Sequence, residues 1–398
     1  MLNQKLKSVY EKLCLVSVFS SVMEKPLFKA FCAYCELDNN AAAAQKSKAY
    51  ATLVSEIYKG GGSLTELVLQ QVFEDENVYV KSVAKKKKVP ACIEQAAKNE
   101  LKAFGLFGGL TSEDFASDMG ISNEALPAFQ TFDADMVALY KKRLKQIDKY
   151  GYGIFSAKGM FRLSDDKQIE AIASADTIGM EAFIGYQDER MKVIQNTRAF
   201  VNGKPAANAL LCGDAGTGKS STVKAVANAF FDEGVRLIEL RKDQLSLLPL
   251  VMSKIVGNPL KFIIFIDDLS FNRSDDNFSM LKAALEGSAS AKADNAVIYA
   301  TSNRRHIIKE SFGDREGDDV HRNDTLQETL SLSERFGLVV LFSKPSKALY
   351  LQIVKELAHK KGVQMDEQVL EIKAEEFALR KGNRSARCAE QFIASLLQ

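Results

Sequence analysis

An octapeptide in the middle of the chain, GDAGTGKS from Gly213 to Ser220, has the residue types that hold the phosphates of a nucleotide. It matches the pattern G-x-x-x-x-G-K-[ST] at every fixed position. The glycines let the backbone turn so that its N–H groups point at a phosphate, and Lys219 adds a positive charge for the β- and γ-phosphates. The Ser220 hydroxyl is suited to bind Mg²⁺. The octapeptide therefore predicts a phosphate-binding loop.

A hydrophobic run closed by two carboxylates, FIIFIDD, covers Phe262 to Asp268. A bound nucleoside triphosphate needs Mg²⁺ held by a carboxylate at the end of a neighbouring strand, and a group that orients the attacking water. We expect Asp267 to hold Mg²⁺ through water and Asp268 to act on the nucleophile. Without the phosphate-binding loop, the same run would read as a strand that ends in a solvated turn.

A third run, AVIYATSN from Ala296 to Asn303, also changes from apolar to polar at its end. If this strand lies beside the acid pair, the Asn303 amide can point at the γ-phosphate and at the attacking water. Such a strand end is common in proteins. This run indicates a functional site only because it follows the two acids in the sequence.

The elements that must position these residues form an alternating pattern from Phe183 onward. Short β-rich runs alternate there with helical runs, which is typical of a parallel α/β sheet. A helix from Ser221 to Phe231 places the phosphates at a helix N-terminus, where the dipole favours anions. Five strands are predicted: Ala209–Cys212, Val235–Leu240, Phe262–Asp267, Ala296–Thr301 and Leu338–Phe342.

The sequence before this sheet is helical in pattern. Residues 1–150 are predicted as a helical domain, 151–182 as a connector that includes a hairpin or an extended segment, 183–343 as the α/β core and 344–398 as a helical lid. The predicted N-terminal helices are Leu2–Met23, Pro26–Glu36, Ala41–Lys59, Ser63–Phe73, Ala91–Phe107, Ser112–Met119 and Asp133–Lys149. Ser63 and Glu66 have the spacing of a capping box.

The composition is that of an ordinary globular protein, with 46% hydrophobic and 26% charged residues and a net charge of +2. This balance gives no general attraction to nucleic acid, although the lysine run Lys85–Lys88 is either a solvated loop or a docking site for an acidic partner. Six scattered cysteines indicate reduced thiols. Cys32 and Cys35 fit a buried helix turn better than a metal site. We find no membrane-spanning stretch and expect a cytoplasmic protein.

Taken together, the motifs resemble those of the AAA+ ATPases. GDAGTGKS resembles Walker A, FIIFIDD resembles Walker B and YATSN resembles the first sensor. Glu334-Arg335-Phe336 looks like the arginine-finger motif, and GNRSARCAEQF, from Gly382 to Phe392, looks like the second sensor in a helical lid. The segment Phe183-Ile184-Gly185-Tyr186 looks like the one that packs on adenine.

The resemblance implies ATP and Mg²⁺ as cofactors. The implied catalytic residues are Asp268, Asn303 and Arg335, and the implied Mg²⁺ ligands are Ser220 and Asp267. The implied ATP contacts are Ile184, Gly185, Tyr186, Gly213, Asp214, Ala215, Gly216, Thr217, Gly218, Lys219, Ser220, Ser221 and Arg387. For the lid sensor, Arg384 is the alternative to Arg387.

More narrowly, ALLCGDAGTGKSSTVKA, FIDDLSF, IYATSNRRH and LSLSERFGL look like a bacterial family of functionally uncharacterised AAA-type ATP-binding proteins, which pair a helical N-terminal half with this module. The acid pair and Arg335-Phe336 are also similar to the replication-initiator and helicase-loader branch. By this resemblance Arg335 reaches the γ-phosphate of a neighbouring subunit, which implies a homo-oligomer. The N-terminal half would then bind a protein partner, and a nucleic-acid role stays open.

One departure from the family pattern bears on turnover. Most AAA+ hydrolases have Asp-Glu at the end of Walker B, whereas Asp268 is shorter than glutamate by one C–C bond, about 1.5 Å. Two functions therefore remain: an ATPase that remodels or loads a partner, and a nucleotide-regulated interaction module with little turnover. Small-molecule kinases share the phosphate-binding loop. That function class does not explain the two sensor motifs or the arginine-finger motif.

Overall fold

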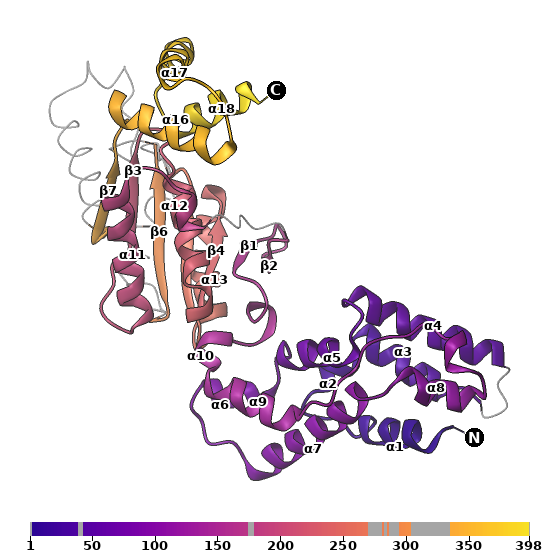
Figure 1. Ribbon diagram of the computed structural model, residues 1–398. Helices are drawn as coiled ribbons and strands as arrows, with labels where there is room; N and C mark the ends of the chain where they lie inside the picture. The colour runs from indigo at the N-terminus through magenta and orange to yellow at the C-terminus, as the bar shows by residue number, and fades with distance from the viewer. Residues whose placement is uncertain are drawn as a thin grey trace. The chain divides into compact units, whose positions relative to one another are not determined.

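The computed structural model describes residues 2–38, 43–173, 179–269, 281, 285, 294–303 and 335–397. The chain divides into two compact units, Met1–Ala157 and Lys158–Gln398 (Figure 1). The first unit is helical, and the second contains a sheet with helices. Each unit has its own buried hydrophobic cluster.

Helices build the first unit. They are α1 (Gln4–Leu13), α2 (Ser20–Met23), α3 (Pro26–Cys35), α4 (Ala43–Lys59), α5 (Leu64–Phe73), α6 (Val78–Ala84), α7 (Ala91–Gly108), α8 (Ser112–Met119), α9 (Met136–Lys145) and α10 (Ile147–Tyr150). Several begin at a polar side chain that accepts a hydrogen bond from a backbone N–H of the first turn, as Ser63 and Asn77 do. Helix α6 was missed by the sequence analysis, although Asn77 supplies its cap.

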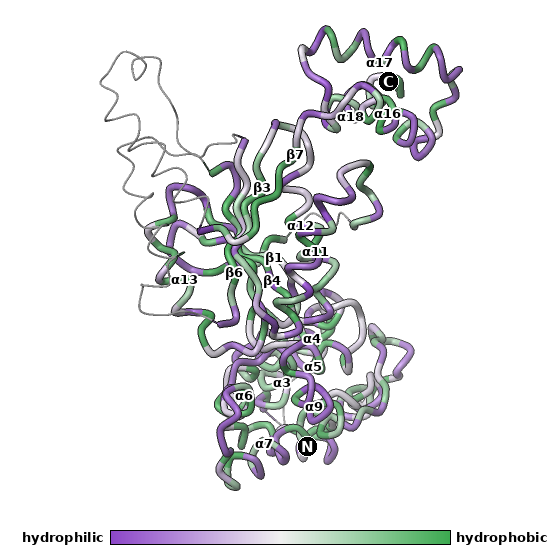
Figure 2. The backbone as a smooth tube through the Cα atoms, turned by 90° about the vertical axis from the view of Figure 1, so that its left-hand side faces the viewer, coloured by the Kyte–Doolittle hydropathy of each residue, from purple (hydrophilic) through white to green (hydrophobic). Residues whose placement is uncertain are grey.

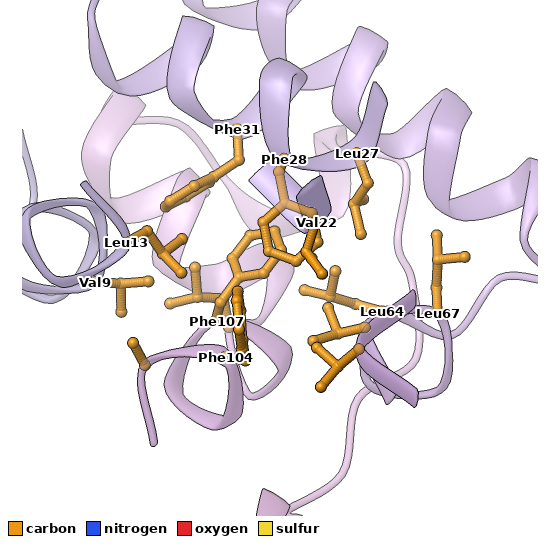
Figure 3. Packing of buried hydrophobic residues seen from close by; sticks show 14 of the residues in the cluster. Val9, Leu13, Val22, Leu27, Phe28, Phe31, Leu64, Leu67, Phe104 and Phe107 are labelled. Carbon is orange, nitrogen blue, oxygen red and sulfur yellow. The ribbon is translucent and has the colours of Figure 1, made fainter. Parts of the chain in front are cut away.

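Aromatic rings from α3 and α7 form the centre of this unit. Figure 3 shows Phe28, Phe31, Phe104 and Phe107 turned toward one another. The ring centroids of Phe31 and Phe107 lie 4.6 Å apart, and those of Phe28 and Phe107 lie 5.0 Å apart. All four side chains are fully buried. Aromatic pairs at this spacing add stability beyond the area that they bury.

The single helix predicted over Leu2–Met23 is wrong, because the chain leaves the helix between Leu13 and Ser20. The carboxylate of Glu100, on α7, explains the break. It accepts hydrogen bonds from the backbone N–H groups of Ser17, Val18 and Phe19, each at 3.0 Å. It also accepts one from the Ser17 hydroxyl at 2.8 Å. A tertiary contact that no local pattern reveals therefore overrides helix propensity here.

Replacing Glu100 by alanine is expected to destabilise the helical unit by about 1–3 kcal/mol, because the buried Phe19 N–H loses its partner and such an unsatisfied donor costs about 1–3 kcal/mol. Urea unfolding of the full chain, followed by hydrogen exchange of peptides within residues 4–35, measures the effect. Glu94→Ala is the matched control, since Glu94 is exposed on the same helix. Equal protection in the two variants would contradict the proposed role of Glu100.

The cysteine pair and the lysine run of this unit have no surroundings that favour a reactive site. Cys32 and Cys35 lie on α3, and burial raises the pKa of both thiols, that of Cys32 to about 11. A raised pKa disfavours the reactive thiolate. Lys85–Lys88 follow α6 and are exposed.

A seven-stranded sheet forms the centre of the second unit, in the order β2-β1-β4-β5-β6-β3-β7. The strands are β1 (Met160–Leu163), β2 (Ile169–Ala171), β3 (Ala209–Gly213), β4 (Val235–Leu240), β5 (Lys261–Ile266), β6 (Ala296–Ser302) and β7 (Leu338–Phe342). Apart from the antiparallel hairpin β1–β2, the pairs are parallel. The predicted count of five strands is therefore corrected to seven, because the hairpin in the predicted connector joins the sheet beside β4.

Helices accompany the strands: α11 (Gln187–Val201), α12 (Lys219–Ala229) and α13 (Leu248–Ile255), followed by α16 (Lys347–Lys361), α17 (Glu367–Lys381) and α18 (Ala386–Leu396). The strands are hydrophobic through most of their length (Figure 2), and every residue of β3 is buried. The last three helices have their own cluster, which includes Tyr350 and Phe392, at one end of the sheet (Figure 1). The predicted α/β class with a helical lid and a helical N-terminal region is confirmed. Among the described helices, none is long and apolar enough to cross a membrane.

Candidate nucleotide-binding site

The order of the strands brings the three sequence motifs to one edge of the sheet. Strand β6 lies between β3 and β5, with Cys212 opposite Ser302 and Ile266 opposite Ala300. The carboxyl ends of these parallel strands therefore meet. The sequence analysis expected the strand with the acid pair to be a neighbour of β3. The sensor strand β6 lies between them instead.

The phosphate-binding loop follows β3 directly. At Gly213 the backbone has φ 132°, and a β-carbon there would lie 2.0 Å from the carbonyl oxygen of Phe342. The next residue, Asp214, donates its N–H to the same carbonyl at 3.1 Å. Only glycine fits this close approach of two chain segments. The loop is thereby fixed against the end of β7.

Lys219, in the first turn of α12, is buried beneath the loop with 5% of its surface exposed. Its ammonium donates to the carbonyl oxygens of Gly213 at 2.9 Å and Asp214 at 2.8 Å, and to Oδ1 of Asn303 at 3.0 Å. Burial lowers its pKa, while the charge of Asp214 opposes this shift. The predicted phosphate lysine and the predicted sensor amide are therefore in direct contact.

The two residues predicted as Mg²⁺ ligands also touch. The Ser220 hydroxyl donates to Oδ1 of Asp267 at 2.6 Å, and the Thr301 hydroxyl donates to the same atom at 2.5 Å. A hydroxyl beside a carboxylate suits Mg²⁺, which takes oxygen ligands and keeps several waters and phosphate oxygens. Within the described ranges no cluster of three or more His, Cys, Asp or Glu residues could hold a metal by itself. A site completed by phosphates is consistent with both observations.

Asp268 lies just beyond β5 with an unusual backbone, φ 51°. Its N–H donates to the Thr301 hydroxyl at 3.0 Å. Its carboxylate accepts a hydrogen bond from Nδ2 of Asn303 at 2.7 Å. Asn303 therefore bridges Lys219 and Asp268, with its oxygen on the cation and its nitrogen on the acid. The Thr301 hydroxyl is hydrogen-bonded to both acids, to the Asp267 carboxylate and to the Asp268 N–H. Thr301 was missing from the predicted site residues.

The predicted adenine segment divides between two environments. Ile184 packs with the lid cluster and also borders a cavity beside the loop. Tyr186 turns toward the sheet, where its hydroxyl donates to the carbonyl oxygen of Ser343 at 2.6 Å and its ring lies 5.4 Å from that of Phe342. Burial raises the pKa of Tyr186 to about 12. Neither Gly185 nor Tyr186 lines the cavity beside the loop.

The cavity beside the loop has a volume of about 100 Å³. Its lining consists of Ala182, Phe183, Ile184, Arg190, Gly216, Thr217, Gly218, Ser221, Ile353, Leu357, Ala386, Arg387 and Glu390. Helix α18 closes one side, where the Arg387 N–H donates to the carbonyl oxygen of Gly216 at 3.3 Å.

The two lid arginines have different surroundings. Arg387 is exposed at the rim of the cavity, whereas Arg384 forms a two-pronged ion pair with Glu375 at 3.0 and 2.7 Å. This pairing lowers the pKa of Glu375 and raises that of Arg384. The geometry thus places Arg387, not Arg384, beside the phosphate-binding loop. Arg190, which also borders the cavity, was missed by the sequence analysis, although an arginine in a first helical turn is unusual because acids are favoured there.

The remaining predicted residues are Arg335, Ser221 and Ala215. Arg335 is half-buried just before β7, and the adjoining Phe336 is buried. Residue 334 lies outside the described residues, as do two further features of the sequence: the basic pair 304–305 directly after the sensor and the charged segment 312–325. Ser221 borders the cavity, and Ala215 is exposed on the loop.

Comparisons with known proteins give a family and a distant structural likeness. A RuvB Holliday junction branch migration motor from Thermotoga maritima is 14% identical with a TM-score of 0.34, over 55% of this chain and 71% of that chain. One of its variants gives 12% identity with the same score and coverage. No curated protein matches the sequence. Residues 156–398, more than half of the chain, match the family described as "Protein of unknown function (DUF815)". The chain belongs to the DUF815 family.

Proposed function

We propose that this protein is an AAA+-type ATPase that binds ATP with Mg²⁺ at the Gly213–Ser220 loop and couples hydrolysis to the remodelling or loading of a partner. One observation carries the proposal. Lys219, Asn303 and Asp268 form a continuous hydrogen-bonded chain beside the Ser220–Asp267 pair. Five groups from three separate sequence motifs thus converge at one helix N-terminus, which is the arrangement that phosphoryl transfer requires.

Each residue has a defined task in this proposal. Lys219 and the loop amides bind the β- and γ-phosphates, so that the lysine exchanges part of its contact with Asn303 for phosphate oxygens. Ser220 and Asp267 hold Mg²⁺, which neutralises phosphate charge when bound. Asp268 accepts the proton of the attacking water, and the Asn303 amide orients that water. Arg387 contacts the phosphates from the lid.

Assembly and partner binding complete the proposal. Arg335 acts on the γ-phosphate of a neighbouring subunit in a cytoplasmic homo-oligomer, and residues 1–150 bind the partner. The support for this part is the motif resemblance around Arg335. A positive group that approaches from outside the site stabilises the charge of the transferred phosphoryl group in the transition state.

Arg335→Ala is expected to lower ATP turnover by at least about 100-fold, with little change in ATP affinity, because an arginine supplied by a neighbour acts mainly in the transition state. Steady-state ATPase assays and size measurements with and without ATP test this. A mixture of Arg335→Ala and Lys219→Ala chains should regain activity, since one chain supplies the arginine and the other an intact loop. A monomer whose turnover ignores the Arg335 change contradicts the proposal.

A second candidate is a nucleotide-regulated interaction module with little turnover. The short Asp268 side chain, which accepts a hydrogen bond from Asn303, favours this second candidate. In this case ATP binding would change partner affinity without hydrolysis. Turnover that is rapid and depends on Asp268 would exclude this candidate.

A helicase-loader-like role rests on the resemblance, on the exposed run Lys85–Lys88 and on the basic pair 304–305, which lies outside the described residues. Salt-dependent binding of single- or double-stranded DNA, lost when these lysines are changed to glutamine, would support it.

A further inference from the structure

A buried arginine on α11 has surroundings that neither the sequence motifs nor the proposed mechanism explains. Arg190 lies in the first turn of α11 and is only 5% exposed. Its guanidinium donates through Nη1 to the carbonyl oxygen of Gly185 and stacks 4.5 Å from the centre of the Phe183 ring. Its Nε is buried without a hydrogen-bond partner.

Burial lowers the pKa of Arg190 to about 10, so the side chain remains a cation at neutral pH. Among the residues described, no ion pair joins Arg190 to a carboxylate, although the charge of the adjacent Glu189 opposes the lowering of its pKa. Burying a charge without a counter-ion costs free energy, so buried charges in proteins are normally paired. A bound ligand can supply the opposite charge.

The position of Arg190 indicates which ligand would supply that charge. It lines the same cavity as Gly216, Gly218 and Ser221, and a β-carbon placed on Gly218 would lie 3.9 Å from its Nη2. The residues at the γ-phosphate end are absent from this cavity lining: Lys219, Asp267, Asp268 and Asn303. Arg190 therefore borders a cavity that the proposed catalytic groups do not line.

We propose that Arg190 is a ligand of the nucleotide and that its guanidinium binds phosphate oxygens of the diphosphate that ADP and ATP share. The inference rests on the proposed nucleotide site and adds a cation to it from the helix that precedes the loop. The Phe183 ring and the Gly185 carbonyl hold the planar guanidinium in place before the ligand arrives. A positioned guanidinium matches phosphate geometry better than a flexible ammonium does.

The test compares Arg190→Gln with wild type in calorimetric titrations with ADP and with a non-hydrolysable ATP analogue, both with Mg²⁺. Glutamine keeps a donor for the Gly185 carbonyl and removes the charge. We expect the affinity for both nucleotides to fall by the same factor, about 10- to 100-fold, since a hydrogen bond to a charged group is strong. Arg190→Lys should lose less, because the charge is retained.

Arg198→Gln is the matched control. Arg198 lies on the same helix, stacks 4.4 Å from the Phe230 ring and pairs with Glu233, but it does not border the cavity. Its affinity for both nucleotides should equal that of wild type.

The outcomes separate the inference from the proposed function. If wild type binds neither nucleotide, the proposed function fails. If wild type binds and Lys219→Ala does not, but Arg190→Gln binds ADP within twofold of wild type, the inference alone fails. A lowered unfolding temperature of the nucleotide-free variant with unchanged ADP affinity would show a purely structural arginine. A loss confined to the ATP analogue would place Arg190 at the γ-phosphate and also overturn the inference.

Discussion

Lys219→Ala is expected to reduce the affinity for Mg²⁺-bound ATP by at least about 100-fold. The lysine ammonium is fixed by three acceptors beneath the loop, so its charge is already positioned when the phosphates arrive. A hydrogen bond to a charged group contributes about 1.5–3 kcal/mol, and the buried setting weakens solvent screening. Calorimetry with a non-hydrolysable analogue measures the loss.

Lys224→Ala is the matched control for Lys219. Lys224 lies on the same helix, and its ammonium is 3.6 Å from the carboxylate of Glu239. It should bind ATP as wild type does. If Lys219→Ala retained wild-type affinity, the phosphate-binding role of the loop would be refuted.

Asp268→Asn is expected to lower ATP turnover by about 100- to 10,000-fold, which is the contribution typical of a general base. The amide cannot accept a proton, but it has the same shape and tolerates the left-handed backbone of this position. Affinity for ATP should be equal or greater, because a negative charge near the phosphates is removed. Single-turnover and steady-state assays separate hydrolysis from binding.

An exposed acid of the same unit provides the control for this change. Asp232→Asn makes the same chemical substitution near the end of α12, and its turnover should equal that of wild type. Asn303→Ala adds a second check, because it frees the Asp268 carboxylate and also removes the amide that we propose orients the water. Wild-type turnover in Asp268→Asn would show that another group activates the water.

The sequence predicted the central sheet well because each strand is a buried apolar run with a polar end. The runs at Val235–Leu240 and Leu338–Phe342 form strands over the same residues as predicted. The hairpin of β1 and β2 could not be placed in the same way. Its few residues gain their sheet position only through pairing with β4, which is a long-range contact.

The same distinction applies to the candidate site. The phosphate-binding loop, the acid pair and the sensor strand each have a local sequence signature. Their residues could therefore be proposed from motifs alone. Thr301 has none, because a hydroxyl at a strand end is common, and the unusual position of Arg190 in a first helical turn does not by itself indicate a ligand. Their surroundings depend on how distant segments meet, at Asp267 for Thr301 and at the Gly218 turn for Arg190. The position of Arg384 likewise depends on a distant residue, since it pairs with Glu375 of another helix while Arg387 borders the cavity.

The backbone at Asp268 also limits how this protein can change by mutation. A left-handed φ of 51° is adopted readily by Gly, Asn and Asp, and costs other residues roughly 1–2 kcal/mol. A single substitution to glutamate would create the acid pair that most AAA+ hydrolases have, but it would place a longer side chain on a strained backbone. The left-handed backbone at residue 268 therefore favours the short acid over the longer base by roughly 1–2 kcal/mol.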